Sequence, residues 1–179
     1  TFVTENGDLD YEEFRFELIK QLSLECSFSE SDFKSYSAAE LSEAVAKDIT
    51  DMLARRGKQI ATVAMPVIRK IYEEHGDRFE NIAIPVTDGK RVFQVSVPFK
   101  KTIDTDGAII FKHIAKIVML VMIDENWKEH LREMDDLKQS VQNAQYEQKD
   151  PLVIYKFESF NLFKNMLEKI NRETLSILA

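Results

Sequence analysis

The sequence predicts a mainly α-helical fold, in which a short β-ribbon interrupts the helices and a long antiparallel two-helix hairpin follows. Three observations support this prediction. Apolar residues recur at helical spacing over most of the 179 residues, one segment alternates apolar with polar residues, and a short polar loop separates the last two helical patterns. Hydrophobic residues make up 44% of the chain and charged residues 31%, a balance typical of folded rather than disordered proteins.

A first helix is predicted from the apolar residues at helical spacing between Phe14 and Cys26. Asp8 and Asp10 precede this pattern and are candidate N-caps. The serine-rich stretch 27–37 follows, and we expect it to break the helix.

A second, longer helix is expected from Ser37 to about His75. Ser37 and Glu40 have the Ser-x-x-Glu spacing of a capping box, which predicts the helix start. Gly57 weakens the helical pattern, and Pro66 is expected to kink or restart the helix because proline has no backbone N–H to donate.

A β-ribbon is predicted at about residues 82–99. Residues 84–86 and 91–97 are rich in β-branched side chains, and Asp88-Gly89 lies in the turn between them. Asp-Gly between two such runs is a strong signal for a hairpin turn. We therefore expect two short antiparallel strands rather than a larger sheet.

The longest helical pattern follows, over about residues 108–142. Apolar residues seven apart predict a seam for packing against another helix. The members of this seam are Leu120, Trp127, Met134 and Val141. Trp127 is expected to be a buried anchor of the seam.

The last helix is predicted to begin at Asp150-Pro151, because a cap residue followed by proline is a helix-start signal. Its apolar residues form two stripes. We expect the first stripe to face the Trp127 seam; it comprises Phe160, Phe163, Leu167, Ile170, Thr174 and Ile177. The second stripe, Tyr155, Leu162 and Met166, is expected to contact something else.

Charge and composition exclude several classes of function. The net charge is −7 and the pI is about 5.1, and the acidic excess lies within residues 1–50, so a nucleic-acid-binding protein is not expected. The longest apolar run, 117–123, is far shorter than the roughly 18 residues of a membrane-spanning helix. The chain begins with Thr1, without an apolar leader, and we expect it to be a piece of a larger protein.

Catalytic motifs are not evident. The five glycines are too far apart for a phosphate-binding loop, and Cys26 is the single cysteine. His130 with Glu133 and Asp135 is a conceivable metal cluster or acid–base set, but these residues lie on two turns of one helix. We expect His130 instead to form a hydrogen bond or to face water.

The C-terminal third resembles the SecA family, the ATP-driven motors of bacterial preprotein export. The resemblance rests on a Trp-Lys-x-His-Leu-x-x-Met-Asp motif, on a Gln-x-Asp-Pro motif, and on the residues that follow as far as Glu168. The motif positions are Asp124, Trp127, His130, Leu131, Met134, Asp135, Asp150 and Pro151. Residues 1–112 match the family only by position and helical character.

The resemblance implies a division into a helical wing domain, 1–112, and the later part of a helical scaffold domain, 113–179. In this family the scaffold hairpin is a two-helix finger, whose loop lies at the SecY channel and contacts the translocating chain. The resemblance places that contact at Gln145, Tyr146, Glu147, Gln148 and Lys149, with Tyr146 at the position of the family's tip tyrosine. The family's tip arginine has no counterpart here, and the β-ribbon is not part of the wing pattern.

The function implied is that of a non-catalytic scaffold and finger element in an ATP-driven translocase. The implied partners are the SecYEG channel, an unfolded preprotein and the other domains of the motor. ATP and Mg²⁺ belong to the parent protein, and no cofactor is expected in this chain. The parent is expected to be cytoplasmic and peripheral at the cytoplasmic face of the inner membrane. The alternative is a helical adaptor that binds a partner helix and has no role in transport.

Overall fold

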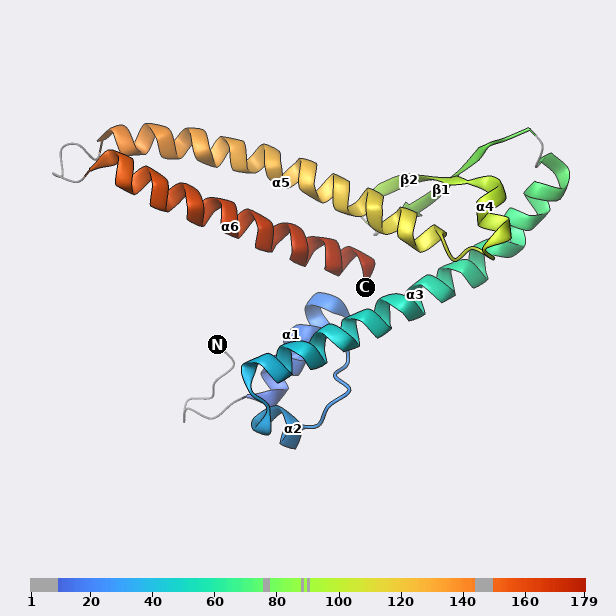
Figure 1. Cartoon of the computed structure of the whole chain (residues 1–179), viewed down its shortest axis with the longest axis horizontal. Helices are drawn as coiled ribbons and strands as arrows, with labels where there is room; N and C mark the ends of the chain where they lie inside the picture. The colour runs from blue at the N-terminus through green and yellow to red at the C-terminus, as the bar shows by residue number, and fades with distance from the viewer. Residues whose placement is uncertain (1–9, 76–77, 88, 90, 144–149) are drawn as a thin grey trace. The chain divides into compact units, whose positions relative to one another are not determined.

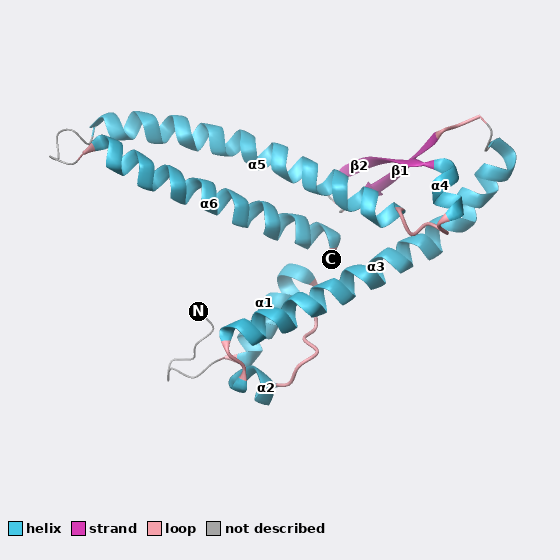
Figure 2. Ribbon diagram, in the orientation of Figure 1, coloured by secondary structure: helices cyan, strands magenta, loops and turns pink. Residues whose placement is uncertain are grey.

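The computed structural model describes residues 10–75, 78–87, 89, 91–143 and 150–179 (Figure 1). The chain divides into two compact units. The first contains the residues up to Ile114 together with Leu178 and Ala179, and the second contains Ala115–Ile177. Helices account for most of the described chain, with one small β-ribbon, as the sequence predicts (Figure 2).

The first unit begins with α1 (Tyr11–Leu22) and α2 (Glu30–Ser35). Asp10 caps α1, because its side chain accepts a hydrogen bond from the Glu13 N–H at 3.0 Å. The helix ends at Leu22, four residues before the predicted end at Cys26, and the C-cap Ser23 has a φ of 48°, in the left-handed region.

The helix α2 lies within the serine-rich stretch and was not predicted. Ser29 and Asp32 form a reciprocal capping box at its start. The ring of Phe33 is 2% exposed and packs with Phe14 and Phe28 in an aromatic cluster. The first helix has ended before stretch 27–37, as expected, but the sequence-based prediction did not consider that Ser29 could cap a further helix within it.

The longest helix, α3 (Ala38–His75), includes Pro66. The predicted capping box is confirmed: the Ser37 N–H donates to Glu40 Oε2 at 2.8 Å, and the Glu40 N–H donates to Ser37 Oγ at 3.3 Å. The helix is assigned continuously through Pro66, so the predicted restart is not observed. Asp48 is buried on this helix and accepts a hydrogen bond from the Ser27 N–H at 2.9 Å.

The ribbon consists of β1 (Asn81–Thr87) and β2 (Val92–Pro98), paired antiparallel with Ile84 opposite Val95. The prediction of a two-stranded ribbon is confirmed. Burial alternates along both strands, and the side chains of Val95 and Val97 are fully buried. Gly89 in the turn has a φ of 84°, a conformation that glycine adopts without strain.

A short helix, α4 (Phe99–Asp104), follows the ribbon and was not predicted. Phe99 is fully buried and meets the Tyr72 ring edge-on, with ring centres 5.0 Å apart. Gly107 then turns the chain with a φ of 78°, and a Cβ at this position would lie 2.9 Å from the Met65 side chain. Both the backbone conformation and the space therefore require glycine.

The hairpin is formed by α5 (Ile110–Asn143) and α6 (Pro151–Leu178). The two helices run antiparallel side by side (Figure 2), which confirms the predicted hairpin. Within the described residues, no helix is both long and apolar enough to cross a membrane.

Candidate functional site

In the hairpin, α5 ends at Asn143 and α6 begins at Pro151. Asp150 caps α6 as predicted, since its Oδ1 accepts a hydrogen bond from the Leu152 N–H at 2.9 Å. The intervening loop, 144–149, contains Gln145, Tyr146, Glu147, Gln148 and Lys149 and lies outside the described residues. The structure therefore describes the helices that support the loop, and the contact assigned to Tyr146 stays a prediction.

The packed face between the helices, here called the hairpin seam, differs from the predicted one. Its buried members on α5 are Met122, Asn126, His130 and Val141, and those on α6 are Met166, Ile170 and Thr174. Three of these side chains are polar, so the seam is not a continuous apolar stripe.

Trp127 is 46% exposed, so the prediction of a buried anchor was wrong. Phe160, Phe163 and Leu167 are also exposed, whereas Met166, from the second stripe, is buried. The predicted seam was thus wrong in part: Val141 and Ile170 are buried as predicted, whereas its aromatic members lie outside the packed face. The physical reason is that the polar side chains of Asn126 and His130 occupy buried positions of α5. A pattern of apolar residues seven apart does not include them.

His130 is 6% exposed, so of the two expected outcomes the one in which it faces water is not observed. Its ring lies beside those of Trp127 and Phe163, with centres 5.6 and 6.0 Å apart. Its Nδ1 has no hydrogen-bond partner among the described residues, and the same holds for the buried Thr174 Oγ1. The aromatic surroundings hold the imidazole as a packing group.

The other motif residues lie at the surface of the hairpin or at its edges. Asp124 forms an ion pair with Lys128 one turn on, Leu131 is about half exposed, Met134 is half-buried and Asp135 is exposed. An exposed pair of this kind stabilises a helix only by about 0.3–0.5 kcal/mol. The motif therefore combines one buried histidine with side chains that the described chain leaves accessible.

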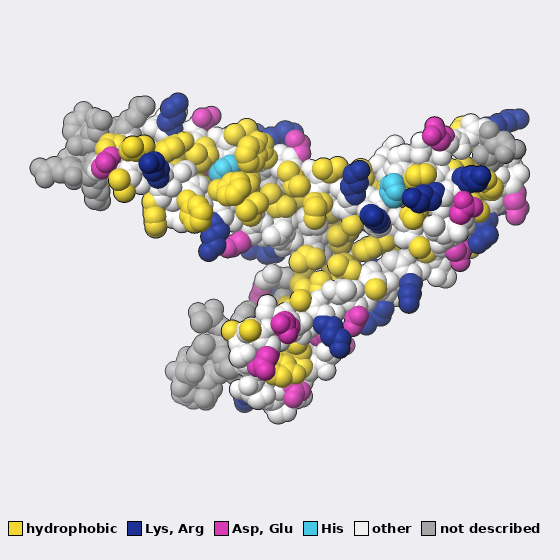
Figure 3. Space-filling view, in the orientation of Figure 1, with side chains coloured by type: hydrophobic (Ala, Val, Ile, Leu, Met, Phe, Trp, Pro, Cys, Tyr) yellow, Lys and Arg dark blue, Asp and Glu magenta, His cyan; other side chains and the backbone are white. Residues whose placement is uncertain are grey.

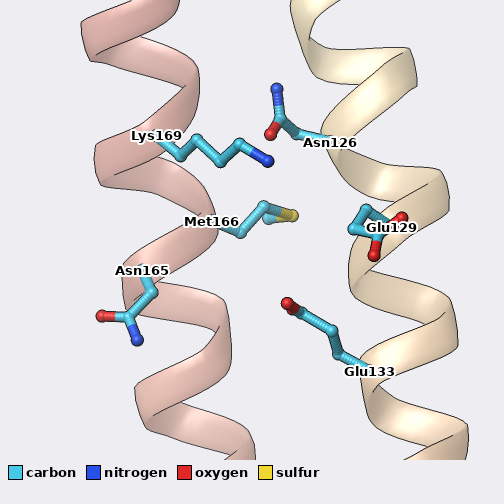
Figure 4. Close-up of a pocket in the computed structure, with 6 residues that line it drawn as sticks. All are labelled: Asn126, Glu129, Glu133, Asn165, Met166 and Lys169. Carbon is cyan, nitrogen blue, oxygen red and sulfur yellow. The ribbon is translucent and has the colours of Figure 1, made fainter.

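Asn126 makes a direct polar contact between the helices. It is 5% exposed, and its Nδ2 donates to Met122 O at 2.9 Å and to Glu173 Oε2 at 2.8 Å. Beside it lies a cavity of about 70 Å³ (Figure 4), lined by Asn126, Glu129, Glu133, Asn165, Met166 and Lys169. The sequence-based prediction missed this contact. The available signal was Asn126 itself, a polar residue directly before Trp127.

Exposed apolar side chains gather over both helices of the hairpin (Figure 3). We call this set the exposed apolar face; it comprises Leu120, Ile123, Trp127, Leu131, Phe160, Phe163 and Leu167, which are 41–66% exposed. A contiguous apolar surface of this kind marks interaction surfaces rather than ordinary solvent-facing helices.

The described residues offer no alternative chemical centre. No group of three or more His, Cys, Asp or Glu side chains is placed to hold a metal ion within the described ranges. Cys26 is half-buried, and this burial, with the nearby Asp48 carboxylate, raises the pKa of its thiol. A raised pKa keeps the thiol protonated and weakly nucleophilic.

Comparisons with known proteins agree with the motif. Residues 3–179 match the family described as the SecA Wing and Scaffold domain. The chain is 47% identical over 178 residues to the protein translocase subunit SecA of Parabacteroides distasonis, covering 99% of this chain and 16% of that protein. It is 44% identical over 172 residues to SecA of Bacteroides fragilis (96% of this chain, 16% of that protein) and 43% identical over 169 residues to SecA of Flavobacterium psychrophilum (94% and 15%). No solved structure matches the chain.

Proposed function

The chain belongs to the SecA family through its wing and scaffold domain, and from this premise we propose that its hairpin is the element that contacts a translocating polypeptide. The chain spans about one sixth of the length of the curated relatives. A role in SecA-type protein translocation follows from the family. The contact at the SecY channel, the preprotein partner and the location at the cytoplasmic face of the inner membrane are parts of the proposal.

The observation that best supports the proposal is the construction of the hairpin. Residues 144–149 connect two helices of 34 and 28 residues, and Asp150 caps the second of them. A site supported by two packed helices is positioned more precisely than a site supported only by irregular chain. Tyr146 in this loop offers a large ring with little side-chain entropy to lose, which suits contact with chains of varied sequence.

ATP binding and hydrolysis belong, in this proposal, to the remainder of the parent protein. The sequence has no glycine-rich phosphate loop, since its five glycines are scattered. The chain is therefore proposed to act as a non-catalytic part of an ATP-driven translocase, and Mg²⁺ and ATP are proposed to bind elsewhere in that protein. The wing and scaffold division at residues 112/113 stays a prediction.

A transport assay with the full-length parent protein tests the proposal. Tyr146→Ala is expected to lower preprotein transport into vesicles severalfold, while the melting curve and basal ATP hydrolysis stay near those of the wild type. Tyr146→Phe should retain most transport because the ring provides the contact area. Tyr146→Asp should lower transport more than Tyr146→Ala does, since the aspartate charge must be desolvated against an apolar segment of the preprotein.

Tyr36→Ala is a matched control, because it removes a tyrosine from the first unit and leaves the hairpin unchanged. Transport by this variant should remain close to wild type. Normal transport by Tyr146→Ala would contradict the proposal. Transport lost together with the fold would show that Tyr146 is a packing residue and would equally contradict it.

The alternative is a helical adaptor that binds a partner helix and has no role in transport. The exposed apolar face favours this reading, because helix-in-groove partners bind to such surfaces. It predicts that Trp127→Ala or Phe163→Ala impairs function whereas Tyr146→Ala does not.

A further inference from the structure

The hairpin seam contains a polar contact that apolar packing does not require. Asn126, one of the most deeply buried side chains of the second unit, donates through Nδ2 to Glu173 Oε2 on the opposite helix at 2.8 Å. Thr174, next to Glu173, is also buried in the seam. A buried amide in a helix–helix seam reduces packing stability but selects one alignment of the helices, because only that alignment gives it a partner.

We propose that the Asn126–Glu173 hydrogen bond fixes the register of α6 against α5 and thereby the axial position of the loop end of the hairpin. Both are positioning residues in this proposal. The proposal depends only on the seam geometry and holds whether or not the loop contacts a translocating chain.

One competing alignment can be specified from the sequence. If α6 slides one turn toward the loop, Ile177 comes opposite residue 126 and Glu173 comes opposite His130. The rest of the seam changes little in character, since the buried places of Met166, Ile170 and Thr174 would be taken by Ile170, Thr174 and Leu178, again two apolar side chains and one threonine. The slide costs Asn126 its partner on the other helix, because Ile177 has no side-chain acceptor. The polar contact therefore distinguishes two alignments that apolar packing alone separates poorly.

Asn126→Leu removes that distinction. A leucine at this position would pack against Ile177 in the displaced alignment, and Glu173 would gain His130 as a partner. A slide of one turn moves α6 by about 5 Å along its axis. We expect the variant to remain helical, because Glu173 is only half-buried and its carboxylate keeps access to water when Asn126 is replaced.

The register is measured by pulsed electron paramagnetic resonance on the 179-residue chain in a Cys26→Ser background. Spin labels at Lys138→Cys and Arg172→Cys occupy exposed positions that are displaced along the hairpin axis. Sliding α6 toward the loop shortens this distance. The chain with Asn126 should give a single distance, and Asn126→Leu should add a component shorter by about 5 Å.

Two control variants should leave the register of α6 against α5 unchanged. Glu173→Gln keeps an oxygen acceptor for Asn126 and should retain the single distance. Met134→Leu changes a half-buried side chain two turns along α5 and should also leave the distance unchanged. Glu173→Ala removes the acceptor and leaves Asn126 in place, and it should also add the shorter component. This variant tests the proposal even if Asn126→Leu does not fold.

An unchanged single distance in both Asn126→Leu and Glu173→Ala would overturn the proposal. A shorter component in Met134→Leu as large as that in Asn126→Leu would also overturn it, since any seam substitution would then disturb the register.

Discussion

The aromatic cluster of the first unit is built from buried rings, whereas the hairpin of the second unit buries a mixture of apolar and polar side chains. In the first, Phe14, Phe28 and Phe33 are at most 9% exposed and pack ring against ring. In the hairpin, Asn126 and His130 are buried, whereas Trp127, Phe160 and Phe163 are exposed. The comparison teaches that helical spacing identifies the apolar residues of a helix but not which of them face its nearest neighbour.

The largest effect that tests this comparison is expected in the aromatic cluster. Phe33 is 2% exposed, and its ring centre is 4.9 Å from that of Phe14. Phe33→Ala should lower the free energy of unfolding of this region by about 3–5 kcal/mol, since it leaves a cavity among rings. Chemical denaturation followed by circular dichroism measures this change. A loss below about 1 kcal/mol would mean that the cluster adds little to stability.

Trp127→Ala should have a smaller effect, because the side chain is 46% exposed. We expect a loss of about 1–2 kcal/mol, in place of the 3–5 kcal/mol appropriate to full burial. The control Leu131→Ala, at a similarly exposed position one turn on, should cost a comparable amount. If Trp127→Ala destabilised the chain as strongly as Phe33→Ala, the contrast between the two regions would disappear.

The smallest effects concern the capping boxes of α2 and α3. Ser37→Ala removes the acceptor for the Glu40 N–H and should cost about 1 kcal/mol. Hydrogen bonds from Ser29 and Ser37 hold the pKa values of Asp32 and Glu40 below their usual values.

A lowered folded-state pKa gives a contribution to stability that is present above the unfolded-state pKa and is lost as the pH falls through the folded-state pKa. Stability of the first region should therefore fall on acidification below the ordinary carboxyl range, and less steeply in Ser37→Ala. Denaturation midpoints measured from pH 6 down to about pH 2.5 provide the check. Equal slopes for both proteins would show that the Ser37 hydroxyl has no part in the acid response, since Ser37→Ala keeps the backbone N–H that donates to Glu40.

Local signals in the sequence predicted the starts of α1, α3 and α6 well. Asp10, Ser37 and Asp150 cap helices at the positions where cap chemistry places them, and Asp88-Gly89 predicted the ribbon. These features depend on neighbouring residues alone. They can therefore be inferred without knowing what else packs nearby.

The rotation of each hairpin helix could not be inferred in the same way. Two apolar stripes run along α6, and only packing decides that Met166 faces α5 while Phe163 stays exposed. Asn126 was passed over because a buried amide is justified only by its partner Glu173, 47 residues away. The motif nevertheless identified the family, since recognition depends on residue identity and spacing rather than on which face is buried.

Photo-cross-linking at the hairpin loop tests the central functional claim most directly. A benzophenone amino acid replaces Tyr146 in the full-length parent protein, and the same label at Lys128, exposed midway along α5, serves as the comparison. With channel-containing vesicles, ATP and a labelled preprotein, position 146 should form an adduct with the preprotein and position 128 should not. The absence of an adduct from position 146 while transport proceeds would contradict the proposed contact.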